Sequence, residues 1–195
     1  MRVAILDYNA GNTRSVQFAL ERLGVEPILT RDPVVLAGVD KVIFPGVGAA
    51  GATMTYLEEM GLDVIIKNLK QPVLGICLGM QLLCAFSEEG NVAGLGIFPQ
   101  KVKRFVAKEG LKVPHMGWNT LSCEEVPLMA GIEAGSYVYF VHSYYAEMSP
   151  YTVASCTYGN CFSAALQKDN FYGTQFHPEK SGSIGAQILE NFIAL

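Results

Sequence analysis

The sequence is poor in charged residues. They make up 16% of its 195 residues, and the net charge is −4, whereas soluble domains typically carry about 25% charged residues. It contains no run of basic residues, which argues against a nucleic-acid-binding surface. Because 50% of the residues are hydrophobic, either the core is extensive or a partner covers part of the apolar surface.

The cysteines and histidines do not form a metal-binding or disulfide pattern. The five cysteines, at 77, 84, 123, 156 and 161, contain no CxxC pair, and the three histidines, at 115, 142 and 177, contain no HExxH motif. We therefore expect neither a metal nor another cofactor. No apolar stretch approaches the ~18 residues of a membrane span, and the N-terminus does not resemble a signal peptide. These features predict a reducing, cytoplasmic location without membrane contact.

Strand and helix patterns alternate through the first half of the chain. Strands are predicted at 2–6, 25–29, 41–44 and 72–76, and helices at 13–23, 51–59, 62–68 and 78–86, with Asn12 as N-cap and Gly24 as stop of the first helix. The second half predicts strands at 97–106, 137–142, 152–157, 163–167 and 172–176, with turns at 158–160 and 168–170, and a closing helix at 184–194 capped by Ser183. We therefore predict a single α/β domain over 1–195, with a central, mostly parallel sheet flanked by helices and an antiparallel hairpin extension.

The segment 72–81 predicts a cysteine nucleophile. A buried strand runs into the turn Gly75-Ile-Cys77-Leu-Gly79, and a helix starts at once, as in a nucleophile elbow. So sharp a turn needs glycines beside the nucleophile and strains its backbone. The helix N-terminus favours the thiolate of Cys77, and the Leu78 amide is expected to face a developing oxyanion. The alternative is a small buried cysteine, which is what we expect for Cys84 on the same predicted helix.

The segment Phe176-His177-Pro178-Glu179 predicts the base and its orienting group. A strand delivers His177 to its carboxyl end, and Glu179 is near enough to hold the imidazole by one nitrogen. An ordinary surface turn is the alternative for this motif taken alone. His142 is the second candidate base and His115 the third, because neither has such a carboxylate beside it.

A glycine loop follows the strand at 41–44. The sequence Gly46-Val47-Gly48-Ala-Ala-Gly51 matches GxGxxG, but the acidic residue that a dinucleotide site needs about 20 residues later is missing. We interpret Gly46, Val47 and Gly48 instead as main chain that approaches the substrate. This loop would be the second half of the oxyanion hole, with Leu78 as the first.

Together these motifs resemble those of the triad-type, or class I, glutamine amidotransferases. Further segments are similar to those of the glutaminase subunits of imidazole glycerol phosphate synthases, and the resemblance covers essentially the whole chain. These segments are Asp7-Tyr-Asn-Ala-Gly-Asn12, Pro114-His-Met-Gly-Trp-Asn119, Phe140-Val-His-Ser-Tyr-Tyr145 and His177-Pro-Glu-Lys-Ser181.

The resemblance implies an activity and a set of roles. Cys77, His177 and Glu179 would hydrolyse glutamine through a glutamyl thioester. Gln81 and Glu89 would contact the amino-acid end of glutamine. The backbone around Gly46, Gly48, Ser143 and Tyr144 would complete the pocket.

The resemblance also implies a partner in a heterodimer. This partner would be a cyclase, a (β/α)8 barrel that uses the ammonia to make imidazole glycerol phosphate and a purine precursor in histidine biosynthesis. Asn12, Trp118 and Lys180 are the candidates for the docking face. The alternatives are a self-sufficient cysteine hydrolase, such as a γ-glutamyl peptidase, and a non-catalytic α/β scaffold.

Overall fold

The computed structural model describes residues 1–8 and 13–195, so the predicted N-cap and docking residue Asn12 lies outside the described residues. The first half of the chain forms β1 (Val3–Leu6), α1 (Thr13–Arg22), β2 (Ile28–Thr30), α2 (Pro33–Ala37), β3 (Lys41–Phe44), α3 (Ala50–Glu59), α4 (Leu62–Asn68), β4 (Val73–Ile76), α5 (Leu78–Leu83), β5 (Cys84–Ser87) and β6 (Val92–Ala93). The second half forms β7 (Phe98–Arg104), β8 (His115–Thr120), β9 (Ser122–Cys123), η1 (Pro127–Met129), β10 (Tyr137–His142), β11 (Tyr144–Ala146), β12 (Thr152–Tyr158), β13 (Asn160–Lys168), β14 (Phe171–Thr174), η2 (Pro178–Lys180) and α6 (Gly182–Ala194).

Most of these strands belong to one mixed sheet. Among the described residues it has eight strands in the order β2-β1-β3-β4-β14-β13-β12-β9, and two smaller sheets pair β10 with β8 and order β11-β7-β5-β6. The five neighbours β2, β1, β3, β4 and β14 pair in parallel. Beyond β14, the pairs β14–β13, β13–β12 and β12–β9 are antiparallel. This arrangement confirms the predicted parallel sheet with an antiparallel extension.

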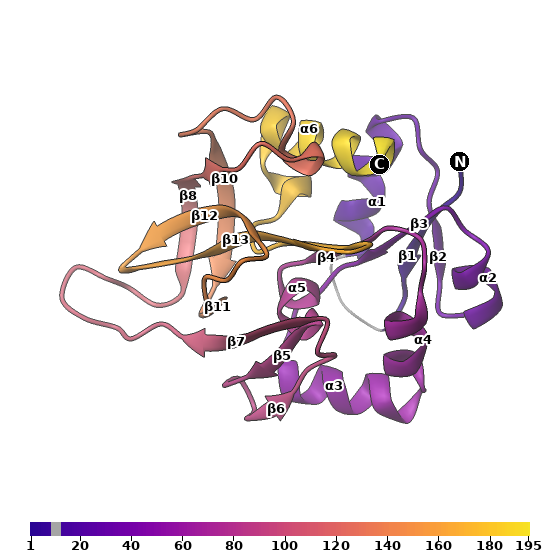
Figure 1. Ribbon diagram of the computed structural model, residues 1–195, viewed down its shortest axis with the longest axis horizontal. Coiled ribbons are helices and arrows are strands. Elements are labelled where there is room, and N and C mark those ends of the chain that lie inside the picture. The colour runs from indigo at the N-terminus through magenta and orange to yellow at the C-terminus, as the bar shows by residue number, and fades with distance from the viewer. Residues whose placement is uncertain (9–12) are drawn as a thin grey trace.

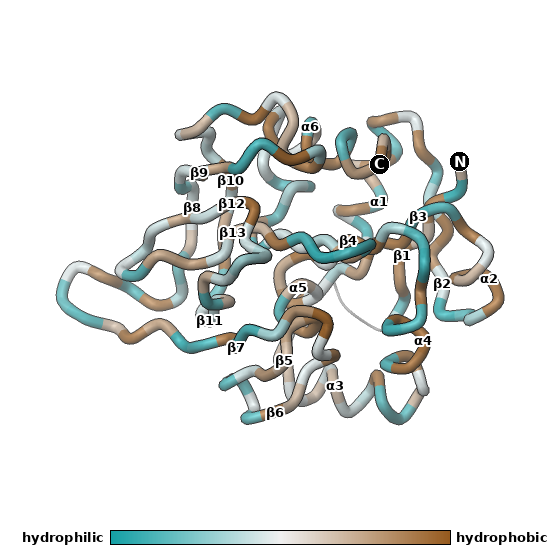
Figure 2. The backbone as a smooth tube through the Cα atoms, viewed as in Figure 1, coloured by the Kyte–Doolittle hydropathy of each residue, from teal (hydrophilic) through white to brown (hydrophobic). Residues whose placement is uncertain are grey.

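Helices cover both faces of the parallel part of the sheet (Figure 1). The alternation of side chains along β1 explains this layering. Val3 and Ile5 pack with α1, α6 and β10, whereas Ala4 and Leu6 pack with α2 to α5 and the sheet around β7. Because both faces are covered, β1 is hydrophobic throughout, which Figure 2 shows as a brown segment inside the molecule.

Two elements near the start differ from the sequence prediction. The strand predicted at 25–29 begins only at Ile28, because the Val25 amide still bonds to the helical Leu20 carbonyl and Pro27 has no N–H for a ladder. The helix α2 was not predicted. Its signals are in the sequence, since Asp32 accepts a hydrogen bond from the Val34 amide at 2.8 Å and a proline opens the helix.

The helix predicted at 78–86 ends at Leu83, and that part of the prediction is wrong. Cys84 instead opens β5, which pairs with β6 and β7. The amide of Leu95 bonds to the Leu82 carbonyl at 2.7 Å, and the amide of Gly96 bonds to the Cys84 carbonyl at 3.1 Å. Tertiary hydrogen bonds therefore replace the next helical turn. Cys84 is fully buried, as expected for a core residue.

The predicted cap of the last helix is also wrong. The residue that precedes α6 is Ser181, not Ser183. The Ser181 hydroxyl donates to the His177 carbonyl at 2.7 Å and accepts from the Tyr139 amide at 2.9 Å. Its side chain thus ties the start of α6 to the loop that carries His177.

Two histidines lie in the aromatic core between β8, β10 and β12. His142 donates from Nδ1 to the Tyr144 carbonyl at 2.7 Å, which leaves Nε2 to accept from His115 Nδ1 at 2.9 Å. Phe140 and Tyr158 stack on opposite sides of His115. Burial lowers the pKa of His115 to about 4, and burial, reinforced by the charges of the other histidines, lowers the pKa of His142 to about 3. Both rings are therefore neutral at pH 7.

This pair predicts loss of stability in mild acid. The folded-state pKa values lie below the value of 6.5 for an unfolded histidine, so the unfolded state binds more protons as the pH falls below about 6.5. At pH 5, His142 by itself should cost about 2 kcal/mol of unfolding free energy relative to pH 8. Urea unfolding at the two pH values measures this difference. His142→Gln should reduce the pH dependence, and equal stability of the wild type at both values would contradict the prediction.

Candidate active site

Three loops meet at one edge of the sheet because β3, β4 and β14 are parallel neighbours. Phe44 pairs with Gly75, and Thr174 pairs with Ile76. The loop that begins at Pro45, the turn at Cys77 and the segment that carries His177 therefore leave the sheet at the same level. This is the carboxyl edge of the strands, where open α/β sheets bind their ligands.

The turn at Cys77 is strained, as the sequence predicts. Cys77 has φ of 54° and ψ of −108°, a conformation that costs a non-glycine residue about 1–3 kcal/mol. A Cβ atom on Gly79 would lie 2.0 Å from the Phe44 carbonyl oxygen, and one on Gly75 would lie 2.7 Å from the Met80 nitrogen. The two glycines therefore allow β3, β4 and the start of α5 to come into direct backbone contact.

His177 lies between Cys77 and Glu179. Its Nδ1 is 2.8 Å from Glu179 Oε1, and the two side chains are 2% and 0% exposed. The short helix η2 turns the chain back so that the carboxylate reaches the ring. With Nδ1 occupied, Nε2 remains free to act on Cys77, which lines the same cavity and raises the pKa of His177. The structure therefore brings together the three predicted catalytic side chains.

Opposing effects act on the pKa of His177. Burial lowers it, but the hydrogen bonds and charges of Cys77 and Glu179 outweigh burial and raise the pKa to about 10. The imidazolium form is thus favoured at neutral pH. A protonated ring next to the sulfur is the acid that an amine leaving group needs.

The loop with His177 is fixed to β10. The His177 amide donates to the Tyr139 carbonyl at 3.0 Å. The Ser181 hydroxyl links the same two residues on their other sides. The imidazole therefore keeps its position although it follows the end of β14.

The sulfur opens into a cavity of about 340 Å3, a size typical of small-molecule sites. All the predicted oxyanion and substrate residues line it, together with Pro114, Val141 and His142. The predicted residues are Gly46, Val47, Gly48, Leu78, Gln81, Glu89, Ser143 and Tyr144. Glu89 comes from the segment between β5 and β6, and its Oε2 accepts from the Ala50 amide at 2.9 Å.

The glycine loop lies against the start of α5. A Cβ atom on Gly46 would lie 2.4 Å from the Gly79 nitrogen and 2.7 Å from Leu78 Cβ. The backbone of Gly48 has φ of +112°, and Val47 is 38% exposed. The loop thus lies against Leu78, and both line the cavity with Cys77, an arrangement that suits an oxyanion hole.

Two buried polar residues at the site, Tyr8 and Gln175, were not predicted from the sequence. The Tyr8 hydroxyl donates to the Pro45 carbonyl at 2.5 Å and so anchors the start of the glycine loop. Burial, followed by the charge of Cys77, raises the pKa of Tyr8 above its ordinary value. Gln175 is 0% exposed and bonds to Gln81. Its place two residues before His177, on the same side of an extended chain, was the available signal.

The ring nitrogens of the second and third candidate bases, His142 and His115, already have hydrogen-bond partners. His142 lines the cavity, but its ring nitrogens bond to the Tyr144 carbonyl and to His115. The other nitrogen of His115 lies 3.4 Å from Asn119 Nδ2. These histidines therefore support the walls of the site.

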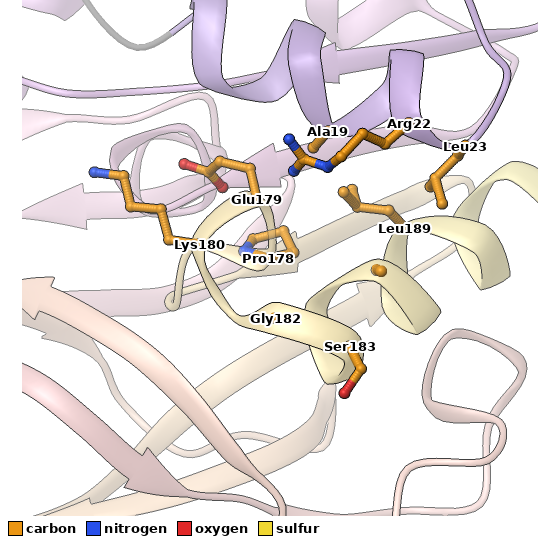
Figure 3. A pocket seen from close by; sticks show the side chains of 10 residues that line it. Ala19, Arg22, Leu23, Pro178, Glu179, Lys180, Gly182, Ser183 and Leu189 are labelled. Carbon is orange, nitrogen blue, oxygen red and sulfur yellow. The ribbon is translucent and has the colours of Figure 1, made fainter.

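Two of the predicted docking residues, Trp118 and Lys180, lie outside this cavity. Lys180 borders a second cavity of about 390 Å3 behind Glu179, between η2, α1 and α6 (Figure 3). Trp118 lies on β8 and is 54% exposed, so its side chain is not buried in the core. Asn12 lies outside the described residues.

The described residues lack two further kinds of feature. No group of three or more potential metal ligands occurs within 1–8 and 13–195. Within the same ranges, no helix has the length and hydrophobicity needed to cross a membrane.

Comparison with known proteins identifies a family over nearly the whole chain. The family model of glutamine amidotransferase class-I matches residues 4–195. The chain is 61% identical to "Imidazole glycerol phosphate synthase subunit HisH" of Bacteroides fragilis, with full coverage of both chains. It is 51% identical to the protein of that name from Escherichia coli K12, again with full coverage of both.

Solved structures share the fold at low sequence identity. A structure described as a glutamine amidotransferase superposes with a TM-score of 0.77 and 18% identity, over 100% of this chain and 98% of the other. A chain of PurLQS from Thermotoga maritima gives a TM-score of 0.73 and 17% identity, over 99% and 97% of the two chains. These likenesses support the α/β fold.

The close approach at Gly79 predicts an unequal effect of two glycine-to-alanine changes in helices. Gly79→Ala would place a methyl group 2.0 Å from a backbone carbonyl, so we expect a loss of about 3 kcal/mol or more in unfolding free energy. Gly51→Ala in α3 meets its nearest atom at 3.5 Å and should be neutral or stabilise by up to about 1 kcal/mol. Urea unfolding measures both. Similar stabilities of the two variants would show that the turn can open.

Proposed function

The chain belongs to the glutamine amidotransferase class-I family, and we propose that it is the ammonia-producing subunit of an imidazole glycerol phosphate synthase. Its enzyme class and its place in histidine biosynthesis follow from relatives at 48–61% identity over their full length. The observation that carries the catalytic proposal is the position of His177, which lines one cavity with Cys77 and whose Nδ1 lies 2.8 Å from the Glu179 carboxylate behind it.

In the proposed first half-reaction, the Cys77 thiolate attacks the side-chain amide carbon of glutamine. The Leu78 amide and the Gly46-Val47-Gly48 loop stabilise the negative oxygen that forms. The His177 imidazolium then gives its proton to the amide nitrogen, the C–N bond breaks and ammonia leaves. A glutamyl thioester with Cys77 and a neutral His177 remain.

The second half-reaction hydrolyses this thioester. His177 takes a proton from a water molecule, whose oxygen attacks the thioester carbon. The C–S bond breaks, glutamate leaves and the thiolate–imidazolium pair is restored. Glu179 keeps the ring oriented and stabilises its charged form throughout. Gln81, Glu89, Ser143 and Tyr144 hold the amino-acid end of the substrate in this proposal.

The ammonia needs a covered path, since ammonia in neutral water is mostly protonated and ammonium is not a nucleophile. We therefore propose a heterodimer with a cyclase of (β/α)8 architecture that consumes the ammonia. The chain would act as a single domain over 1–195 in the cytoplasm. The Gly46-Val47-Gly48 loop would act as a switch, since a peptide flip there points an N–H into the oxyanion hole when the loaded cyclase is bound.

We place the docking surface on the outer face of β8 and β10, beside the loop of His177. Met116, Trp118 and Tyr137 are 63%, 54% and 60% exposed there. They alternate with the buried His115, Val138 and Phe140 on the same strands. Aromatic residues and methionine are enriched at the centres of protein interfaces. Lys180 of η2 completes the proposed surface, and Asn12 remains a docking candidate from the sequence resemblance alone.

Glutaminase assays test the catalytic proposal. Cys77→Ala should abolish glutamate release from glutamine, and Glu179→Gln should lower kcat by about a hundredfold or more because the imidazolium loses its carboxylate. The wild type should be slow alone and faster with the cyclase and its nucleotide substrate. Full turnover without a partner would favour a self-sufficient hydrolase. No labelling of Cys77 by a glutamine-like electrophile would favour a non-catalytic scaffold.

A change at Trp118 tests the docking surface. Trp118→Ala should weaken binding to the cyclase by about tenfold or more, as expected for a central aromatic residue, with an unchanged unfolding midpoint. Isothermal titration calorimetry measures the affinity. Val34→Ala on α2, where Val34 is 79% exposed, is the matched control. Equal affinity of both variants would place the interface elsewhere.

A further inference from the structure

We propose that Gln175 is a catalytic residue whose side-chain amide donates a hydrogen bond to the Cys77 sulfur and stabilises the thiolate. The Nε2 atom of Gln175 lies 3.7 Å from Cys77 Sγ, within the range of hydrogen bonds to sulfur. The inference extends the proposed function, since it adds a second donor to the sulfur beside His177.

The hydrogen-bond network fixes which end of the Gln175 amide faces the sulfur. Gln81 Nε2 lies 2.8 Å from the Tyr144 carbonyl, which can only accept, so this end of Gln81 is the NH2 group. The same nitrogen lies 2.9 Å from Gln175 Oε1. Gln175 therefore presents its oxygen to Gln81 and its NH2 group to Cys77.

Hydrogen bonds hold both the backbone and the side chain of Gln175. Its backbone amide donates to the Ala164 carbonyl of β13 at 2.8 Å. The residue is 0% exposed, and Gln81 is 4% exposed. The Tyr144 carbonyl that anchors Gln81 also accepts from His142. An amide that is buried and bonded in this way cannot turn away at small cost.

The other groups that face the sulfur make the donor role specific to the thiolate. The Val141 carbonyl lies 4.0 Å from Cys77 Sγ and accepts from the protonated thiol. His177 and Tyr8 are the titratable groups that act on the sulfur from the neighbouring loops. Once the proton has left, Gln175 and His177 both donate to the negative sulfur, and Gln175 stays neutral.

A neutral donor of this kind serves both half-reactions. Gln175 transfers no proton, so it orients the thiolate before the C–S bond forms and stabilises the sulfur again as that bond breaks. In the second step the sulfur is the leaving group and regains its negative charge. A hydrogen bond to a charged group is about twice as strong as one between neutral groups, so loss of the donor should slow the step in which the C–S bond breaks by about tenfold or more.

The test compares Gln175→Met and Gln175→Asn with Gln100→Met in the full-length chain. Met removes the donor, and Asn keeps an amide but shortens its reach. Gln100 is also buried, but within the described part of the chain its side-chain amide has no hydrogen-bond partner. Iodoacetamide is applied across a pH series, and mass spectrometry follows modification of Cys77. Thermal unfolding identifies the variants that remain folded.

We expect the pH midpoint of Cys77 alkylation to rise by about one pH unit or more in both Gln175 variants, with no change in Gln100→Met. The kcat for glutamine should fall about tenfold or more, with KM within about twofold. An unchanged midpoint in a folded Gln175 variant would overturn the inference. If Gln175→Met does not fold, Gln175→Asn decides. Alkylation does not need glutamine, so the two proposals can fail separately. If the alkylation midpoint rises in the Gln175 variants but the wild type shows no glutaminase activity, the proposed function is rejected and the role of Gln175 at the sulfur is retained.

Discussion

The direct backbone contact between the ends of β3 and β4 and the start of α5 is the constraint on which the site depends. The helix can begin directly beside the sulfur because Gly75 and Gly79 have no side chains where those segments touch. The same contact brings the Gly46 loop against Leu78. The strained conformation of Cys77 follows from this geometry, and the parallel sheet around it is buried on both faces and resists relaxation of the turn.

Around this turn, buried polar groups are joined in series. From Asn119 through His115 and His142 to the Tyr144 carbonyl, and from there through Gln81 and Gln175 to the sulfur, each member bonds to the next. Burial of such groups is costly unless they are paired. The neutral histidines and the two amides therefore define one arrangement of the cavity wall, whereas in the proposed reaction the charge changes are on His177 and the sulfur.

The site and the proposed docking surface share β10. Its inner side chains, Val138 and Phe140, belong to the core, and the backbone of Tyr139 holds the His177 loop. Its outer side chains lie beside Trp118 on the exposed face. A partner bound to this face would contact the strand that positions the His177 imidazole, which gives a short physical connection between the proposed docking surface and the proposed catalytic site.

The sequence by itself determined the local features of the site and several helices and strands, because each depends on residues that are close together in the chain. The Gly-x-Cys-x-Gly turn, the His177–Glu179 spacing and the hydrophobic periods of β1, β3 and α4 were predicted with nearly correct bounds. The early end of α5 and the start of β5 were decided by tertiary structure, since the Gly94–Gly96 segment supplies the hydrogen bonds that end the helix. So were the roles of Tyr8 and Gln175, whose partners are 37 and 94 or more residues away in the sequence. Such contacts form only when separate strands meet. The position of Gln175 two residues before His177 places it near the site but does not specify its partners.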